Sequence, residues 1–320
     1  YNREDAQKYT QFRWWPGLTF GDMLNKAADI YPHKEAFVDG KSRLTFSQAR
    51  QNVNRLAISM MELGIKPLTR VLVQVPNWNE FVYGYIALQK IGAIPVLLID
   101  RYRQLEINHL AQLTGATTWI VPERYKKIDY LPIIRDVLAN NPAMVNVILA
   151  RGAAHEGCLN MEKLIDRAGL SKDYLDRLAN RKPDPDQVAH MGPTGGTTGA
   201  SKAVTLSHTN LVSNAWQQYQ WTRGSFAKET MLAVLPFFHS YGMSATVMGG
   251  AAMGATLVMH HRFNTRQVIR LLEAHHPTVF HAVPAMLVAM NERFRSCRPQ
   301  VEGLRWVISG GAPLEEAVAR

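Results

Sequence analysis

The feature that most constrains the chain is a glycine- and hydroxyl-rich stretch at residues 191–202, Met-Gly-Pro-Thr-Gly-Gly-Thr-Thr-Gly-Ala-Ser-Lys. It holds four glycines, three threonines, one serine and a lysine. Glycine lets the main chain approach a ligand closely, and successive N–H groups in such a segment form a concave anion site. The hydroxyl groups add hydrogen-bond donors and Lys202 adds a positive charge. This combination is typical of a site for a polyphosphate.

Other interpretations of this stretch are less consistent with the sequence. A Walker A loop places its lysine directly after the last glycine, whereas here Gly199 is followed by Ala200 and the lysine is Lys202. The dinucleotide pattern G-x-G-x-x-G is also absent. A flexible linker is the remaining alternative, because glycine- and serine-rich stretches are often linkers. Against it, residues 203–206 are apolar or β-prone and a helical pattern begins near Ser207.

The charge of the chain is positive but dispersed. The 36 lysines and arginines exceed the 26 acidic residues, which gives a net charge of +10. A basic protein can bind nucleic acid or an anionic membrane, yet no long run of lysine and arginine is present. We therefore expect an anionic substrate such as ATP or CoA, and no nucleic-acid partner.

Cysteine content and hydropathy predict a cytoplasmic protein. Cys158 and Cys297 lie far apart in no metal-binding spacing, which suits a reducing compartment. Apolar runs such as residues 91–99 are far shorter than the ~20 residues that span a bilayer, so we expect no transmembrane segment.

Apolar runs and helical periods alternate along the chain. A strand at residues 70–75, a helix at 80–91 and a strand at 94–99 predict a βαβ unit with parallel strands. The same alternation continues to the end of the sequence. It predicts an α/β fold of two stacked lobes with largely parallel sheets. The proline-broken connector at residues 181–186 would separate a first lobe, 1–182, from a second lobe, 183–320.

Two further motifs follow apolar strands. Residues 236–242, Pro-Phe-Phe-His-Ser-Tyr-Gly, come after a predicted strand at 231–235. Ligands of open parallel sheets bind beyond the carboxyl ends of the strands, and an aromatic cluster with one histidine suits an apolar carboxylate. The alternative is a strand-end turn with a satisfied core histidine. Residues 309–314, Ser-Gly-Gly-Ala-Pro-Leu, form a strand-to-helix turn with proline at the first helical position.

Together these motifs resemble those of the adenylate-forming superfamily, which includes acyl- and aryl-CoA synthetases, luciferases and adenylation domains of nonribosomal peptide synthetases. Residues 194–203 resemble its phosphate-binding signature S/T-S/G-G-S/T-T-G-x-P-K-G, with Ser201 in place of proline and Ala203 in place of the last glycine. Residues 236–242 are similar to P-F/L/M-F/Y-H-x-x-G, and residues 309–314 to S/G-G-A-x-L/P. The order of the motifs is the same, and the likeness covers nearly the whole chain.

The resemblance implies a role for each motif. On the phosphate side of ATP it places Thr194, Gly195, Gly196, Thr197, Thr198, Gly199 and Lys202. On the adenine side it places Gly310, Gly311, Ala312 and Pro313. In the acid site it places His239, Ser240, Tyr241 and Gly242. Lys202 and His239 would be the catalytic side chains, and Thr198 would contact Mg²⁺.

The implied activity is that of an AMP-forming acid–thiol ligase. Such an enzyme makes an acyl adenylate from a carboxylic acid and ATP-Mg²⁺, then passes the acyl group to a thiol. The family continues with a Y-G-x-T-E segment, a ribose-binding aspartate, a hinge and a C-terminal domain with a catalytic lysine. These are not present in the 320 residues. We therefore expect the large N-terminal domain of such an enzyme, truncated before its barrel and its C-terminal domain are complete. This piece by itself should have impaired activity. The sequence leaves open whether the protein forms a homodimer.

The acid and the thiol acceptor are less constrained. Residues 77–81, 89–95 and 101–107 resemble the 2,3-dihydroxybenzoate and salicylate AMP ligases of siderophore assembly. Those enzymes carry asparagine after the motif histidine, where this chain has Ser240, and residues 237–242 look more like acyl-CoA synthetases. We predict a CoA ligase for an aromatic, alicyclic or medium-chain acid. The second interpretation is an aryl-acid AMP ligase that loads the phosphopantetheine of a carrier protein, and the third is a non-catalytic nucleotide- or acyl-binding fragment.

Overall fold

A computed structural model describes residues 2–194 and 202–319 of the chain. The chain forms two compact units. The first comprises Tyr1–Asp22, Gln48–Pro76 and Glu80–Val212, and the second comprises Met23–Ser47, Asn77–Asn79 and Ser213–Arg320. This division differs from the boundary expected after residue 182, because the two strands that flank the glycine-rich signature pair with the sheet of the first unit.

The first unit is built on a seven-stranded sheet with the order β11-β10-β4-β3-β5-β8-β9. Neighbouring strands are parallel except for the antiparallel pair β10–β11. The strands are β3 (Arg70–Val73), β4 (Ile94–Leu97), β5 (Thr118–Pro122), β8 (Asn146–Ala150), β9 (Leu159–Asn160), β10 (Val188–Pro193) and β11 (Ala203–Ser207). The central strands are apolar runs buried along their length, as expected where helices cover both faces of a parallel sheet.

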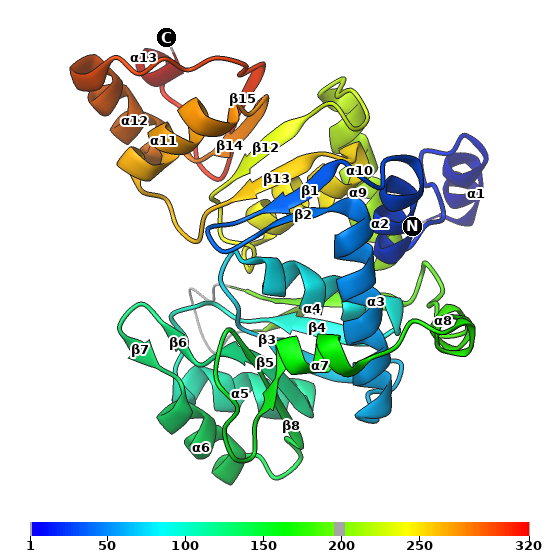
Figure 1. The fold of residues 1–320 in the computed structure, drawn as a ribbon. Coiled ribbons are helices and arrows are strands. Elements are labelled where there is room, and N and C mark those ends of the chain that lie inside the picture. The colour runs from blue at the N-terminus through cyan, green and yellow to red at the C-terminus, as the bar shows by residue number, and fades with distance from the viewer. Residues whose placement is uncertain (1, 195–201, 320) are drawn as a thin grey trace. The chain divides into compact units, whose positions relative to one another are not determined.

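Helices connect these strands, and the predicted βαβ unit is confirmed as β3-α4-β4 (Figure 1). The helices with residues in this unit are α1 (Arg3–Gln11), α2 (Phe20–Ile30), α3 (Phe46–Glu62), α4 (Asn79–Lys90), α5 (Gln104–Thr114), α6 (Leu131–Asn140), α7 (Met161–Arg167), α8 (Lys172–Ala179) and α9 (His208–Trp221). A small hairpin pairs β6 (Arg124–Tyr125) with β7 (Ile128–Asp129). The single helix predicted over residues 161–179 is wrong: Ser171 begins a new helix, because its side chain accepts a hydrogen bond from the Tyr174 N–H.

Helix α4 is tied to β10 by buried polar side chains. The Tyr85 hydroxyl lies 3.2 Å from Nδ1 of His190, and Nε2 of Gln89 donates to the Ala189 carbonyl at 2.8 Å. Burial lowers the pKa of His190 to about 4, so its imidazole is neutral at pH 7. These contacts fix the strand that leads into the glycine-rich signature.

The second unit is built on a six-stranded sheet with the order β15-β14-β12-β13-β1-β2. Its strands are β1 (Glu35–Val38), β2 (Arg43–Thr45), β12 (Thr230–Ala233), β13 (Thr256–Met259), β14 (Val279–Ala282) and β15 (Trp306–Ser309). All pairs are parallel except the β1–β2 hairpin. The sequence predicted that hairpin from an Asp-Gly turn, and Asp39 Oδ1 indeed accepts from the N–H groups of Lys41 and Ser42.

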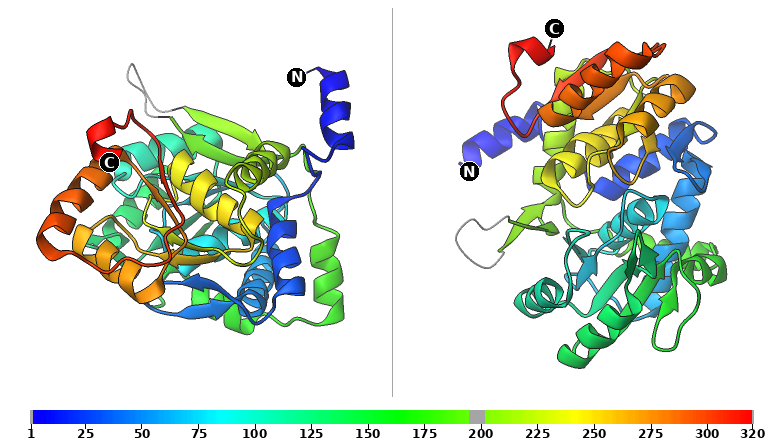
Figure 2. Two further views of the ribbon diagram at one scale, coloured as in Figure 1. Left: turned by 90° about the horizontal axis from the view of Figure 1, so that it is seen from above. Right: turned by 90° about the vertical axis from the view of Figure 1, so that its left-hand side faces the viewer.

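Helices α11 (Thr265–His275) and α12 (Pro284–Cys297) lie side by side on one face of this sheet (Figure 2). Val268, Leu272 and Met290 of these helices share a buried core with Val258 of β13. The π-helix η1 (Gly242–Met248) continues into α10 (Gly249–Met253), whose Gly250 lies against the Leu257 side chain of β13, on the face opposite Val258. The last helix is α13 (Glu316–Ala319). Within the described residues, no helix is long and apolar enough to cross a membrane.

The buried side chain of Asn77 holds the carboxyl ends of β12 and β13 together. Its Nδ2 donates to the carbonyl of Leu235 at 2.8 Å and to that of His260 at 3.2 Å. Its Oδ1 accepts from the Phe237 N–H at 2.9 Å. Leu235 and Phe237 follow β12, and His260 follows β13. One amide therefore satisfies three main-chain groups just beyond the strand ends.

We expect acid to weaken the first unit through His190. Unfolded His190 would protonate near its ordinary pKa of 6.5, whereas the folded residue resists protonation until about pH 4. The stability is therefore fully present above pH 6.5 and is lost as the pH falls toward 4, by up to about 3 kcal/mol. His190→Asn should flatten the pH dependence of the urea-derived unfolding free energy. The exposed control His33→Asn should leave it unchanged, and equal pH dependence in all three proteins would contradict the prediction.

Asn77→Ala should lower the free energy of unfolding by about 3 kcal/mol, because it leaves three main-chain groups without their partner and each costs about 1–3 kcal/mol when buried. Urea denaturation measures the loss. Asn140→Ala, at an exposed helix position, is the matched control and should cost under about 1 kcal/mol. A similar small loss for Asn77→Ala would show that the strand ends are held by other contacts.

Candidate functional site

The described ends of the glycine-rich signature are held together as a hairpin. Pro193 of β10 pairs with Ala203 of β11. Beyond this pair the Thr194 N–H donates to the Lys202 carbonyl at 2.9 Å, and the Lys202 N–H donates to Oγ1 of Thr194 at 3.2 Å. The predicted residues Gly195, Gly196, Thr197, Thr198 and Gly199 lie outside the described residues, and so does the predicted Mg²⁺ contact of Thr198.

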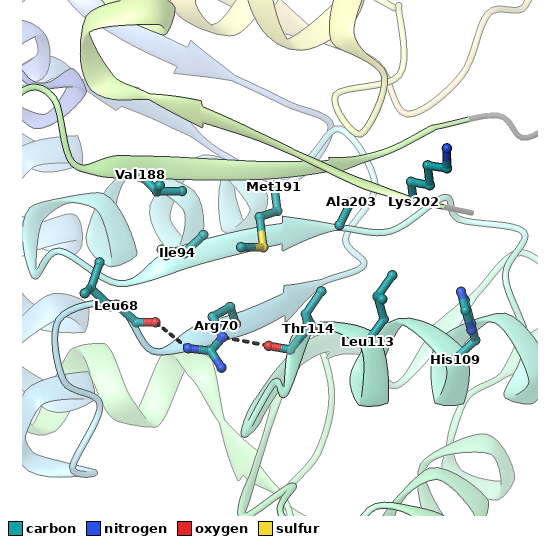
Figure 3. Close-up of a pocket in the computed structure, with 10 residues that line it drawn as sticks. All are labelled: Leu68, Arg70, Ile94, His109, Leu113, Thr114, Val188, Met191, Lys202 and Ala203. Atoms are coloured by element: carbon teal, nitrogen blue, oxygen red, sulfur yellow. Dashed lines mark hydrogen bonds between the residues drawn. The ribbon is translucent and has the colours of Figure 1, made fainter. Parts of the chain in front are cut away.

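The exposed side chain of Lys202 lies at one end of a pocket of about 800 Å³ in the first unit (Figure 3). The pocket is lined by Leu68, Arg70, Ile94, His109, Leu113, Thr114, Val188, Met191, Lys202 and Ala203. Arg70 lies within it and donates to the carbonyls of Thr114 and Leu68. No acidic residue is among these ten, and Lys202 makes no ion pair with any residue that the structure describes. Its charge can therefore meet an anionic ligand.

In the second unit, the aromatic motif forms the turn between β12 and η1. Phe237 is buried, His239 and Ser240 are exposed, and Tyr241 is half-buried. The Tyr241 N–H donates to Nδ1 of His239 at 3.2 Å. Because Nδ1 is the acceptor, the neutral imidazole carries its proton on Nε2. His239 can therefore donate from Nε2 to a carboxylate or phosphate oxygen.

Gly242 makes this turn possible. A β-carbon at this position would lie 2.1 Å from the Pro236 carbonyl oxygen, so only glycine fits. The hydroxyl of Thr246 donates to the Gly242 carbonyl in the first turn of η1. A π-helix at this place bulges the main chain, a departure from α-helical geometry that is frequent at functional sites. The predicted helix over residues 243–253 is thus observed, but its first part is π-helical.

The glycine-rich turn after β15 lies against the same segment. The Gly310 N–H donates to the Ala282 carbonyl at 3.1 Å, and Gly311 has a φ of +84°. A β-carbon at Gly310 would lie 2.9 Å from Cζ of Tyr241. The structure therefore brings the motif of residues 236–242 and that of residues 309–314 together at the carboxyl edge of the sheet.

The remaining predicted residues of this turn, Ala312 and Pro313, are exposed. The helix expected from Leu314 begins instead at Glu316. Thr194 and Lys202 belong to the first unit, and the motifs of residues 236–242 and 309–314 belong to the second.

Two residues at the edge were not singled out from the sequence. Asn77 was named only within residues 77–81, which resemble the aryl-acid AMP ligases, and its own signal is an amide directly after a buried strand and a proline. His281 is a lone histidine in the apolar strand β14. Its Nδ1 lies 3.4 Å from the Tyr241 hydroxyl, and burial lowers its pKa to about 4. The signal for His281 is a titratable residue near the carboxyl end of an apolar strand.

The described residues offer no preformed metal cage. They contain no group of three or more His, Cys, Asp or Glu side chains that could hold a metal ion. Mg²⁺ is commonly bound through substrate phosphates and one or two protein oxygens. A magnesium ion bound here would therefore take most of its oxygen ligands from the phosphate groups of a nucleotide and from water, and few from the protein.

Comparison with known proteins agrees with the motifs. The chain is 29% identical over 323 residues to a salicylyl-CoA synthase / salicylate adenylyltransferase of Streptomyces sp, covering 99% of this chain and 58% of that protein. It is 28% identical over 320 residues to the 2,3-dihydroxybenzoate-AMP ligase of Bacillus subtilis (strain 168), covering 99% of this chain and 57% of that protein. The chain thus spans little more than half the length of these relatives.

The fold is similar to that of the apo structure of MbtA from Mycobacterium smegmatis, with a TM-score of 0.85 and 25% identity over 100% of this chain and 57% of that one. This likeness confirms the predicted α/β fold with largely parallel sheets, that of the N-terminal domain of adenylate-forming enzymes. The profile of the AMP-binding enzyme family matches residues 24–320. The chain therefore belongs to the AMP-binding enzyme family.

Proposed function

We propose that the protein is an AMP-forming ligase that activates an aromatic carboxylic acid with ATP and transfers the acyl group to CoA. The observation that carries this proposal is the family match over residues 24–320, joined to relatives named for salicylate and 2,3-dihydroxybenzoate. The meeting of Tyr241 and Gly310 at the carboxyl edge of a parallel sheet supports it, because ligands of such sheets bind at that edge.

The proposed reaction has two steps. A carboxylate oxygen attacks the α-phosphorus of ATP, the bond from that phosphorus to the bridging oxygen breaks, and pyrophosphate leaves. The thiol then attacks the acyl carbon and AMP leaves. Because the carboxylate and the triphosphate are both anions, positive charge and aligned N–H donors are needed to bring them together.

The chain's own residues would supply that environment. Thr194 and Lys202 would hold the phosphates together with the signature residues between them, and Mg²⁺ would neutralise phosphate charge with Thr198 as a contact. His239 would donate from Nε2 to the acid or to a phosphate oxygen. Ser240, Tyr241 and Gly242 would line the acid site, and Gly310, Gly311, Ala312 and Pro313 would border adenine.

The proposed reaction has two candidate thiol acceptors. CoA is our first choice, because residues 237–242 resemble acyl-CoA synthetases and one relative is named as a CoA synthase. A carrier protein is the second candidate, because another relative is named as an AMP ligase of 2,3-dihydroxybenzoate. We place the reaction in the cytoplasm, where ATP is available and Cys158 and Cys297, which form no disulfide, stay reduced.

We expect ATP–pyrophosphate exchange by the full-length protein to require an aromatic acid. Benzoate and 2-hydroxybenzoate should support faster exchange than cyclohexanecarboxylate or hexanoate, and a reaction without acid is the control. Exchange with hexanoate alone would contradict the aromatic assignment. No exchange with any acid, in protein shown to be folded, would contradict adenylation and favour a nucleotide-binding fragment. Loss of the free thiol of CoA or of a carrier protein, as it becomes the acyl thioester, then identifies the acceptor.

Lys202→Ala should raise the KM for ATP by about 10- to 100-fold in the same assay, because a charge-assisted hydrogen bond is worth about 1.5–3 kcal/mol. The KM for the acid should change by less than about threefold, since the proposed role of Lys202 is on the phosphate side. Lys202→Arg keeps the charge and should retain most of the affinity for ATP. Lys172→Ala, which alters an exposed lysine of α8, is the control. Equal losses for ATP and acid would refute the assigned role.

A further inference from the structure

The ring of Tyr241 is fixed by groups from two strands and a turn. Its hydroxyl donates to the Ile308 carbonyl of β15 at 3.0 Å and lies 3.4 Å from Nδ1 of His281 in β14. The ring meets the imidazole edge-on, with 5.8 Å between centroids and an interplanar angle of 87°. Gly310 lies against the ring and has no β-carbon that would displace it. Tyr241 itself follows β12, so three neighbouring strands determine where the phenol lies.

The proton positions in this cluster follow from the partners. Burial raises the pKa of Tyr241, so the hydroxyl keeps its proton at pH 7. A carbonyl can only accept, and the hydroxyl proton is therefore donated to Ile308. The contact with His281 then requires Nδ1 to donate to the phenolic oxygen. Since the buried imidazole is neutral at this pH, His281 is the Nδ1–H tautomer.

We infer that His281 is a positioning residue that sets the size limit of the acid site through Tyr241. The inference rests on the proposed function, in which Tyr241 lines that site. A phenol held by two hydrogen bonds stays in one rotamer and forms a fixed wall. Without the bond from His281 the ring can turn aside, and a bulkier acid gains room. His281 would therefore select among acids without touching them.

A matched pair of substitutions separates this role from simple packing. His281→Asn and His281→Leu introduce side chains of similar shape at a position that is 4% exposed. The asparagine amide can donate an N–H in place of Nδ1–H, whereas leucine cannot. A purely structural histidine would be replaced better by leucine, because a buried amide without a partner is costly. Thermal unfolding of both variants shows that each is folded before activity is compared.

The test is ATP–pyrophosphate exchange by the full-length protein with benzoate and with 2-naphthoate. The unaltered protein should prefer benzoate. His281→Leu should reduce that preference about tenfold, the size of effect expected when one buried hydrogen bond is lost. The change should lie in the KM values of the acids, with the KM for ATP unchanged, and His281→Asn should restore the preference. An unchanged preference in His281→Leu, or no preference in the unaltered protein, would overturn the inference.

Tyr241→Phe gives a second test, because it removes the hydroxyl that His281 contacts. The effects of Tyr241→Phe and His281→Leu on acid preference should not add in the double variant, whereas independent effects would add. Nitrogen NMR of the imidazole should show Nδ1 protonated in the unaltered protein and a mixture of tautomers in Tyr241→Phe. An Nε2–H tautomer in the unaltered protein would overturn the inference.

The NMR result does not depend on catalysis, so the two proposals can fail separately. Absence of exchange with every acid would refute the proposed function and with it the role in acid selection, even where the tautomer is as expected. Exchange with a normal acid preference in His281→Leu would refute the role of His281 alone.

Discussion

The hydrogen bonds of the buried Asn77 amide at the carboxyl ends of β12 and β13 are the interaction on which the second unit's candidate site depends. Parallel pairing brings the carboxyl ends of the strands to one edge of the sheet, but it leaves main-chain groups there without ladder partners. Asn77 satisfies three of them at once and thereby fixes where the segment after β12 departs. His239, Ser240 and Tyr241 all lie on that segment.

The candidate site of the second unit depends on two places where the main chain at a glycine lies in close contact with a neighbouring segment. At Gly242 a β-carbon would collide with the Pro236 carbonyl, and at Gly310 it would collide with the Tyr241 ring. These glycines lie in different motifs, and each lets a neighbouring segment approach to contact distance. The motifs of residues 236–242 and 309–314 therefore meet within one unit, although about seventy residues separate them in the chain.

In the first unit, Thr194 and Lys202 are held in place by a pair of strands. The β10–β11 pair holds Thr194 and Lys202 together at its end, while the buried contacts of Tyr85 and Gln89 anchor β10 to α4. Lys202, exposed and without an ion pair among the described residues, retains its charge for a ligand.

The fold class, the family and the order of the motifs could be predicted from the amino-acid sequence, because alternating apolar runs and glycine-rich signatures are local patterns. It also predicted the β1–β2 hairpin and the β3-α4-β4 unit, which depend on turns and periods within a few tens of residues. It did not predict that β10 and β11 pair with the first unit's sheet, nor the contacts of Asn77 and His281. Those depend on partners distant in the chain: the carbonyl of Leu235 lies 158 residues from Asn77, and the hydroxyl of Tyr241 lies 40 residues from His281. Only tertiary structure decides such pairings, because no local pattern specifies which buried group will meet which.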